Sequence, residues 1–282
     1  MDIVFLLLPG LVFSLLMVLT HTYLGVHVLA RGIIFVDLAL AQVAAFGVSI
    51  AFLLGQESHG THAQVYALSA ALIASFAFAG LRRLRDKTTR EVTIGCVYVV
   101  ATALTIVILS RSTQGMEELK QMLNGNILWV RWEEVLVLVA VYGVLSFLHG
   151  VFFPRFLALS ISENPDTGPG FLWEFLFFAS FAVIITLAVN FAGVLMVFAF
   201  LIIPAFSASM LSHDPRKQIL IGWTIGATGT IAGLAMSYFF DLPTGATTVS
   251  LLGLMPLLAI LARSAWALMT PTSSAVKADQ PK

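Results

Sequence analysis

Long runs of apolar residues follow one another along almost the whole chain, and this pattern constrains the fold more than any other feature. Each run is close to the roughly 20 residues that a helix needs to cross a ~30 Å hydrocarbon core. Only 11% of the residues are charged, against roughly 25% in soluble domains. So few charges cannot cover a surface that faces water. We therefore predict an all-α, polytopic bundle of transmembrane helices.

The runs predict about nine membrane spans, or eight if one of them re-enters the bilayer without crossing it. The nine segments are approximately 3–29, 33–54, 64–81, 92–110, 134–152, 172–189, 193–211, 218–239 and 247–265. We assign residues 1–268 to one transmembrane domain. The polar residues 269–282 are expected to form a disordered cytoplasmic tail.

The distribution of Lys and Arg predicts the orientation, because the cytoplasmic loops of membrane proteins carry an excess of these residues. Twelve of the 15 Lys and Arg residues fall on one side of the predicted bundle. The opposite side has only Arg111, Lys120 and Arg131, and its loops are rich in Glu. We therefore predict a bacterial inner-membrane protein with its N-terminus outside and its C-terminus in the cytoplasm.

Several classes of function can be set aside. A formal net charge of zero gives no electrostatic support for a nucleic-acid partner. The single cysteine, Cys96, cannot form an intrachain disulfide. None of the five lysines lies in a Gly-x-x-x-x-Gly-Lys-Ser/Thr loop. We therefore expect the chain to be no enzyme and to bind no cofactor, so any ATP that drives it would be hydrolysed on a separate partner subunit.

Polar residues in or beside the predicted spans are candidates for a substrate pathway. Asp37, near the cytoplasmic start of the second span, either contributes to such a pathway or pairs with Arg31 at the interface. Gln42, farther along the same helix, either contacts the substrate or hydrogen-bonds a neighbouring helix. His59 and His62 share an outer loop, where they either receive a metal ion or are simply solvated. No complete set of metal ligands can be assigned from the sequence.

Three stretches carry more specific patterns of residues. They are 25–31 (GVHVLAR) leading into 40–47 (LAQVAAFG), 122–128 (MLNGNIL), and the series 191–197 (FAGVLMV), 201–205 (LIIPA), 212–217 (SHDPRK) and 241–247 (DLPTGAT). Together they resemble the ABC-3 family of ATP-binding cassette permeases for zinc, manganese and iron. The resemblance runs over about residues 20–265 and implies a permease of the vitamin-B12 and metal-importer type.

The resemblance also implies partners. The expected complex contains a second permease copy, cytoplasmic ATP-binding cassette ATPases and an extracytoplasmic metal-binding protein that delivers the cargo. The segment that transmits force from the ATPase would follow Pro204, whose missing backbone donor permits a bend. By sequence alone this segment can equally be an ordinary cytoplasmic turn. Its candidate residues are Ser207, Ala208, Ser209, Leu211, His213 and Arg216.

The chain departs from the family pattern at the start of the second span. The family typically reads Gly-Asp-Ala-Leu-Ser-His-Ala there, whereas this chain has Leu38 at the Asp position and Gln42 at the His position. Asp37 is displaced by one residue, or about 100° around a helix. Three interpretations therefore remain open: a divalent-metal importer, the same machine with a metal chelate or other small nutrient as cargo, and a stand-alone secondary transporter. A membrane scaffold without transport is a fourth.

Overall fold

The computed structural model describes residues 3–57, 60–84, 86–111, 115–125, 127, 130–161 and 169–269. Within these residues the chain is built from helices and has no β-strand, which confirms the predicted fold class. The helices are α1 (Ile3–Arg31), α2 (Val36–Leu53), α3 (Thr61–Gly80), the short 3-10 helix η1 (Leu81–Arg83), α4 (Lys87–Leu109), α5 (Gly115–Asn124), α6 (Trp132–Val151), α7 (Phe153–Ile161), α8 (Phe171–Leu211), α9 (Pro215–Phe240) and α10 (Thr244–Met269). The tail predicted from residue 269 lies outside this description beyond Met269.

Eight helices of the described chain are long and apolar enough to cross a membrane: α1–α4, α6 and α8–α10. The sequence predicts nine spans, and the difference lies in α8. This helix has 41 residues and contains both predicted segments 172–189 and 193–211. Its backbone leaves the helical conformation at Gly193, where φ is 72° and ψ is 161°. The count of eight helices takes α8 once, whereas the nine-span prediction counts its two arms separately.

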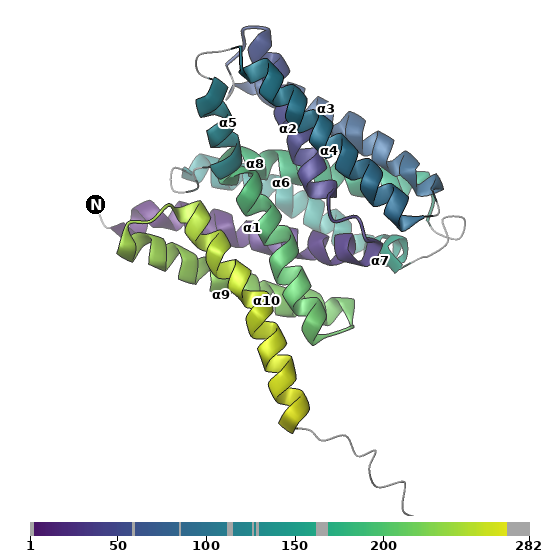
Figure 1. Cartoon of the computed structure of the whole chain (residues 1–282), viewed down its shortest axis with the longest axis vertical. Coiled ribbons are helices and arrows are strands. Elements are labelled where there is room, and N and C mark those ends of the chain that lie inside the picture. Colours follow the sequence, from purple (N-terminus) through teal and green to yellow (C-terminus); the bar gives the residue numbers. More distant parts are fainter. Residues whose placement is uncertain are drawn as a thin grey trace, which may run out of the picture.

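The contacts of α8 with α1 show that the two arms run in opposite directions. The ring of Phe191 meets that of Phe13 early in α1, and Glu174 at the start of α8 pairs with Arg31 at the end of α1. After the kink, Ala205 packs against Gly25, again toward the end of α1. The first arm therefore runs antiparallel to α1 and the second arm parallel to it, so the chain reverses direction at Gly193 (Figure 1).

Glycine is required at this reversal for two reasons. A φ of 72° with an extended ψ is a conformation that other residues rarely adopt. In addition, a Cβ on Gly193 would collide with the backbone of Leu123–Gly125 at the end of α5. Gly125 also has a positive φ, and a Cβ there would collide with Ala192 and Gly193. The two glycines therefore allow the kink of α8 and the end of α5 to touch backbone to backbone.

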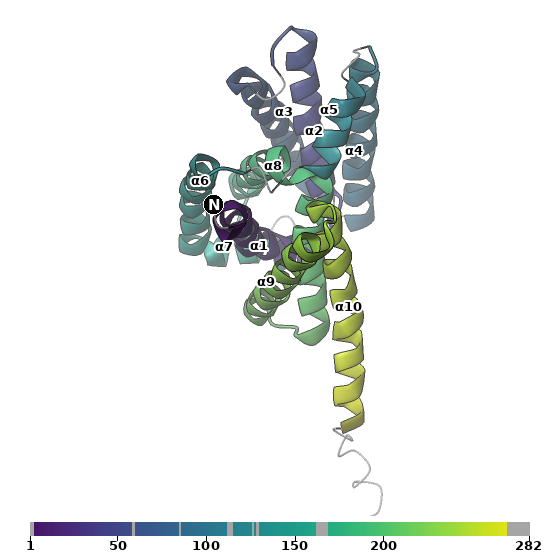
Figure 2. The same ribbon diagram turned by 90° about the vertical axis from the view of Figure 1, so that its left-hand side faces the viewer.

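Helix α8 connects two groups of helices. It packs against α3 and α2, which together with α4 form one side of the molecule (Figures 1 and 2). It also packs against α1, α9 and α10 on the other side. Small residues permit the close approach of this second group. Gly222 and Gly226 of α9 face Thr22 and Val18 of α1, while Gly229 and Gly233 face α10.

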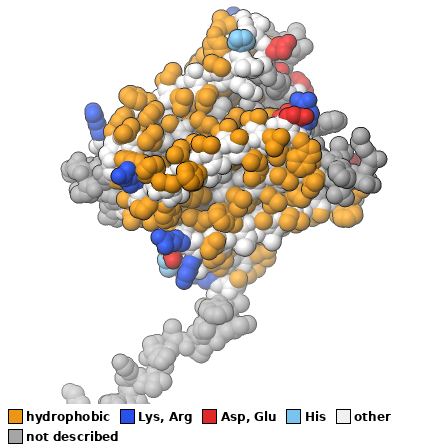
Figure 3. All heavy atoms as spheres, turned by 180° about the vertical axis from the view of Figure 1, so that it is seen from behind, with side chains coloured by type: hydrophobic (Ala, Val, Ile, Leu, Met, Phe, Trp, Pro, Cys, Tyr) orange, Lys and Arg blue, Asp and Glu red, His pale blue; other side chains and the backbone are white. Residues whose placement is uncertain are grey.

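The outer surface has the character expected of a protein in lipid. Figure 3 shows side chains of hydrophobic type over most of the visible face, with most of the basic groups toward the left and bottom and most of the acidic groups toward the upper right. Large apolar side chains such as Ile73, Phe147 and Leu257 are exposed. Exposure of so much apolar surface to water is unfavourable, so this face contacts the lipid of the membrane.

Candidate substrate cavity

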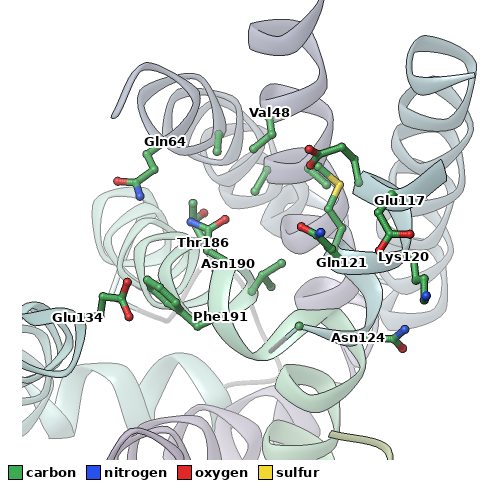
Figure 4. A pocket seen from close by; sticks show the side chains of 17 residues that line it. Val48, Gln64, Glu117, Lys120, Gln121, Asn124, Glu134, Thr186, Asn190 and Phe191 are labelled. Atoms are coloured by element: carbon green, nitrogen blue, oxygen red, sulfur yellow. The ribbon is translucent and has the colours of Figure 1, made fainter. Parts of the chain in front are cut away.

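A cavity of about 580 Å³ lies between α2, α3, α5, α6 and α8 (Figure 4). Its lining residues are Ala44, Ala45, Val48, Gln64, Ala67, Glu117, Glu118, Lys120, Gln121, Met122, Asn124, Gly125, Glu134, Thr186, Val189, Asn190 and Phe191. A hollow of this size matches the range of roughly 300–1,000 Å³ in which small-molecule sites fall. We refer to it below as the substrate cavity.

Local sequence explains how the cavity forms. Ala44 and Ala45 leave space beside α2, because neither side chain extends beyond Cβ. The kink at Gly193 ends the first arm of α8 at the cavity wall, which brings Asn190 and Phe191 to it. The contact between Gly193 and Gly125 closes the wall toward α5. The stretches 122–128 and 191–197, far apart in sequence, therefore meet at this cavity.

Besides its apolar side chains, the cavity is lined by five neutral polar ones: Gln64, Gln121, Asn124, Thr186 and Asn190. Figure 4 shows Thr186 and Asn190 close together, one turn apart on α8, with Gln64 to one side of them and Gln121 to the other. The side chain of Thr186 is buried, and its hydroxyl has no hydrogen-bond partner within the described part of the chain. An unpartnered buried hydroxyl is costly. Thr186 can therefore bond to a ligand or to water in the cavity.

Charged groups lie around these neutral ones. Glu117, Glu118 and Glu134 carry negative charge, and Lys120 alone among the described lining residues carries positive charge. Glu134 is held by the backbone of Arg131, whose N–H donates to its carboxylate at 2.8 Å. The excess of carboxylates attracts cations to the cavity.

The described residues contain no group of three or more His, Cys, Asp and Glu side chains that could hold a metal ion. The cavity instead offers amide and hydroxyl groups, with carboxylates at its edge. Transition metals such as zinc prefer imidazole and thiolate ligands, whereas carboxylate, carbonyl and water oxygens suit manganese. The chemistry of the lining is therefore suited to a hydrated hard cation or to a cargo with its own polar groups.

Asp37 and Gln42 lie on α2 but outside the substrate cavity. Both are buried, with exposed fractions of 1% and 5%. Neither carboxylate oxygen of Asp37 has a hydrogen-bond partner in the described structure. The alternative in which Asp37 pairs with Arg31 is wrong, because Arg31 pairs with Glu174 at 2.9 Å. A pathway role for Asp37 and Gln42 stays a prediction.

The predicted histidine loop is only partly described. His62 is exposed at the start of α3, two residues before Gln64 of the cavity. His59 lies outside the described residues, so its distance from His62 is not defined. Neither residue lines the substrate cavity, and their receipt of a metal ion stays a prediction.

The predicted coupling segment divides into a buried and an exposed part. Ser207 and Ala208 are fully buried, and the Ser207 hydroxyl donates to the carbonyl of Ile203 at 2.8 Å. Their side chains therefore cannot form a surface for a partner, because the neighbouring helices cover them. Ser209 is half-buried. Of the predicted residues, Leu211, His213 and Arg216 are exposed, so a partner contact by this segment stays a prediction for this later part only.

A buried polar network crosses the end of the bundle opposite to the substrate cavity, and sequence reasoning missed it. His27 shares a hydrogen bond with the Ser160 hydroxyl at 2.7 Å, and Arg31 donates to the same oxygen at 3.2 Å. Nη1 of Arg31 also donates to the carboxylate of Glu174 at 2.9 Å, which extends the network to α8. One sequence signal could have found it: Arg31 and Glu174 have opposite charges and adjoin long apolar runs, where an unpaired charge is unfavourable.

A second branch of polar contacts joins α6 to α1 and α8. His149 bonds to the Tyr23 hydroxyl at 3.2 Å through Nδ1 and to the Ser180 hydroxyl at 2.8 Å through Nε2. Its ring also stacks on Phe156, with the ring centroids 4.1 Å apart. Both ring nitrogens of His149 thus have partners, which favours a structural role for it, whereas Nε2 of the buried His27 has no hydrogen-bond partner in the described structure.

Comparisons with known proteins match the chain over almost its full length. The sequence pattern of the ABC 3 transport family matches residues 4–263. The chain is 27% identical over 230 residues to the manganese transport system membrane protein MntC of Listeria innocua, covering 80% of this chain and 79% of that protein.

Two solved structures share the fold. One is PsaBC from Streptococcus pneumoniae in complex with Fab, with a TM-score of 0.73, 21% identity and coverage of 90% of both chains. The other is an inward-facing conformation of a putative metal-chelate type ABC transporter, with a TM-score of 0.67 and 18% identity. It covers 91% of this chain and 85% of that one.

Proposed function

Because the chain belongs to the ABC 3 transport family, we propose that it is the membrane-spanning permease subunit of an ATP-binding cassette importer for a divalent metal ion. The observation that carries this proposal is the family match across residues 4–263. The substrate cavity supports it, because two of the family-like stretches meet there. The chain supplies the pathway, and a cytoplasmic ATPase subunit supplies the energy.

The proposed orientation places the substrate cavity toward the outside of the cell. The chain is a multi-pass membrane protein, and we assign its N-terminus to the outside of the inner membrane and its C-terminus to the cytoplasm. The cavity contains Phe191, which contacts Phe13 early in α1, and the cluster of arginines lies near the other end of α1. An extracytoplasmic binding protein would then release its cargo next to Glu117, Glu118 and Glu134.

A second cargo is favoured by a specific observation. The described residues provide no preformed set of metal ligands, and the substrate cavity presents neutral amides and a hydroxyl. Such groups can hydrogen-bond the organic part of a metal chelate, which already satisfies the metal. The same permease, working as a dimer of two copies, would then move a chelated metal.

Reconstitution tests both cargoes. The permease, its ATPase and its binding protein are placed in proteoliposomes, and uptake of manganese, zinc and iron is measured with and without a chelator. We expect uptake that requires ATP, and its dependence on the chelator identifies the cargo. Uptake that proceeds without ATP indicates a secondary transporter. A complete complex that takes up neither free nor chelated metal contradicts the proposal.

A matched pair of variants connects uptake to the cavity. Asn190→Leu removes a polar group from the cavity wall with little change in volume. We expect roughly 5- to 150-fold slower uptake, because a polar cargo loses a hydrogen bond worth roughly 1–3 kcal/mol when its donor or acceptor is left unpaired. The control Thr228→Val removes an exposed hydroxyl on α9 that bonds only to its own helix. Equal uptake by both variants would exclude the cavity from the pathway.

A further inference from the structure

A second, much smaller cavity of about 40 Å³ lies near the end of α1, on the opposite side from the substrate cavity. Four of its lining residues are basic: Arg31 from α1, Arg82 from η1, and Lys87 and Arg90 from the first turns of α4. Glu174 is the single acidic residue among the described lining residues. We call this hollow the basic pocket. Since one buried water needs roughly 10–15 Å³ of such space, the pocket has room for a small polyatomic group.

Arg31 is the most constrained of the four. Its exposed fraction is 5%, and its guanidinium carbon lies 3.8 Å from the centre of the Phe177 ring. Nη1 donates to Glu174 at 2.9 Å and Nε donates to Ser160 at 3.2 Å. Nη2 is buried and has no hydrogen-bond partner in the described structure. A buried donor on a cation is costly when it is unused, and this one belongs to a side chain that cannot turn away.

Among the described lining residues of the basic pocket, positive charges outnumber negative ones. Arg82 and Arg90 both repel Arg31 electrostatically, and Glu174 is already bonded to Arg31. A second buried donor, Nε of Arg90, also has no partner among the described residues. Water screens this repulsion less at the buried Arg31 than it would at the surface. An anion bound between Arg31 and Arg90 would relieve it.

Other nearby carboxylates do not enter the basic pocket. Glu91 accepts a hydrogen bond from the backbone N–H of Phe35 at 3.0 Å and is not among the lining residues. Asp86 caps α4 by accepting from the backbone of Thr88 and Thr89. Each carboxylate therefore has a backbone partner outside the pocket, while Oε2 of Glu91 is left without a partner among the described residues.

We propose that the basic pocket binds the phosphate group of an anionic ligand, which is either a lipid headgroup or free phosphate. Nη2 of Arg31 and Nε of Arg90 donate charge-assisted hydrogen bonds to its oxygens. Lys87, on the exposed rim, adds a flexible point charge. Because the pocket joins α1 to α4 and α8, a bound phosphate links the two sides of the bundle.

The experiment uses the full-length permease, purified with its ATPase subunits and stripped of lipid. One arm measures binding of radiolabelled inorganic phosphate at fixed ionic strength. The other measures retention of phosphatidylglycerol against phosphatidylcholine by native mass spectrometry. Arg90→Gln is the test variant, since Arg90 is half-buried and its loss leaves the Arg31–Glu174 pair intact. Arg155→Gln is the control with the same change in charge, because Arg155 is exposed on α7 and lies over Trp173 outside the pocket.

We expect about tenfold weaker binding in Arg90→Gln, because one charge-assisted hydrogen bond is lost, and no change in Arg155→Gln. Saturable binding of inorganic phosphate supports the site with free phosphate as its ligand. Selective retention of phosphatidylglycerol without phosphate binding supports it with a lipid headgroup. Failure of both arms in the native protein overturns the proposal, as does an equal loss in the two variants, which would show only general attraction by surface charge.

Discussion

Replacement of Gly193 by alanine tests the reversal of α8 on which the substrate cavity depends. The backbone there has φ 72° and ψ 161°, a region that is essentially restricted to glycine. Holding another residue in such a conformation costs about 1–3 kcal/mol. The new Cβ would also collide with the backbone of Leu123–Gly125, and that backbone cannot move as a side chain can. We therefore expect a total cost of about 3 kcal/mol or more, near the upper end of the conformational range.

Thermal unfolding of the purified permease measures this cost. Each kcal/mol lowers the unfolding temperature by roughly 2–4 °C in a domain of 150–250 residues, so Gly193→Ala should lower it by roughly 6–12 °C. Gly143→Ala is the control, because Gly143 lies inside α6 and a Cβ there meets nothing within 4 Å. Alanine is favoured over glycine in a helix by about 1 kcal/mol, so the control should be unchanged or more stable.

Transport gives an independent measurement of the same variant. If the kink relaxes, Asn190 and Phe191 leave the wall of the substrate cavity, and uptake falls even at temperatures where the protein remains folded. The claim that the reversal of α8 requires glycine would be refuted if Gly193→Ala had the same unfolding temperature and the same uptake rate as the native protein.

Three further changes test other parts of the structure. Asp37→Asn should leave assembly intact. If the buried carboxylate contacts the cargo, metal uptake should fall at least about tenfold, because hydrogen bonds to charged groups contribute roughly 1.5–3 kcal/mol. Unchanged uptake would remove Asp37 from the pathway. Glu174→Gln should lower the free energy of unfolding by roughly 3–5 kcal/mol, because it leaves Arg31 buried without its counter-charge; a variant as stable as the native protein would contradict this account. Ala208→Trp should destabilise the fold, because the site is fully buried. His213→Trp changes an exposed site, so it should leave the fold intact and weaken co-purification with the ATPase. Normal co-purification and uptake in His213→Trp would show that this segment is not the coupling element.

The sequence alone determined the class of fold and much of its architecture. Apolar runs of helical length leave no stable alternative to membrane-spanning helices, because every backbone polar group must be satisfied within its own segment in lipid. The order of the family-like stretches determined the family. Even the boundary between the segments 172–189 and 193–211 was visible, because glycine at 193 interrupts an apolar run.

Only the tertiary structure decided which residues come together. Thr186 and Gln64 are ordinary polar residues in the sequence, and they form one cavity because α8 reverses at Gly193 and packs on α3. Ser207 and Ala208 were predicted to belong to the segment that contacts the ATPase, yet neighbouring helices bury them. Sequence distance left Asp37 as one possible partner of Arg31, whereas packing pairs Arg31 with Glu174, 143 positions away. Periodicity and hydropathy are local properties of a chain, so they define its helices. The partners of a side chain depend on how distant helices pack, which no local pattern contains.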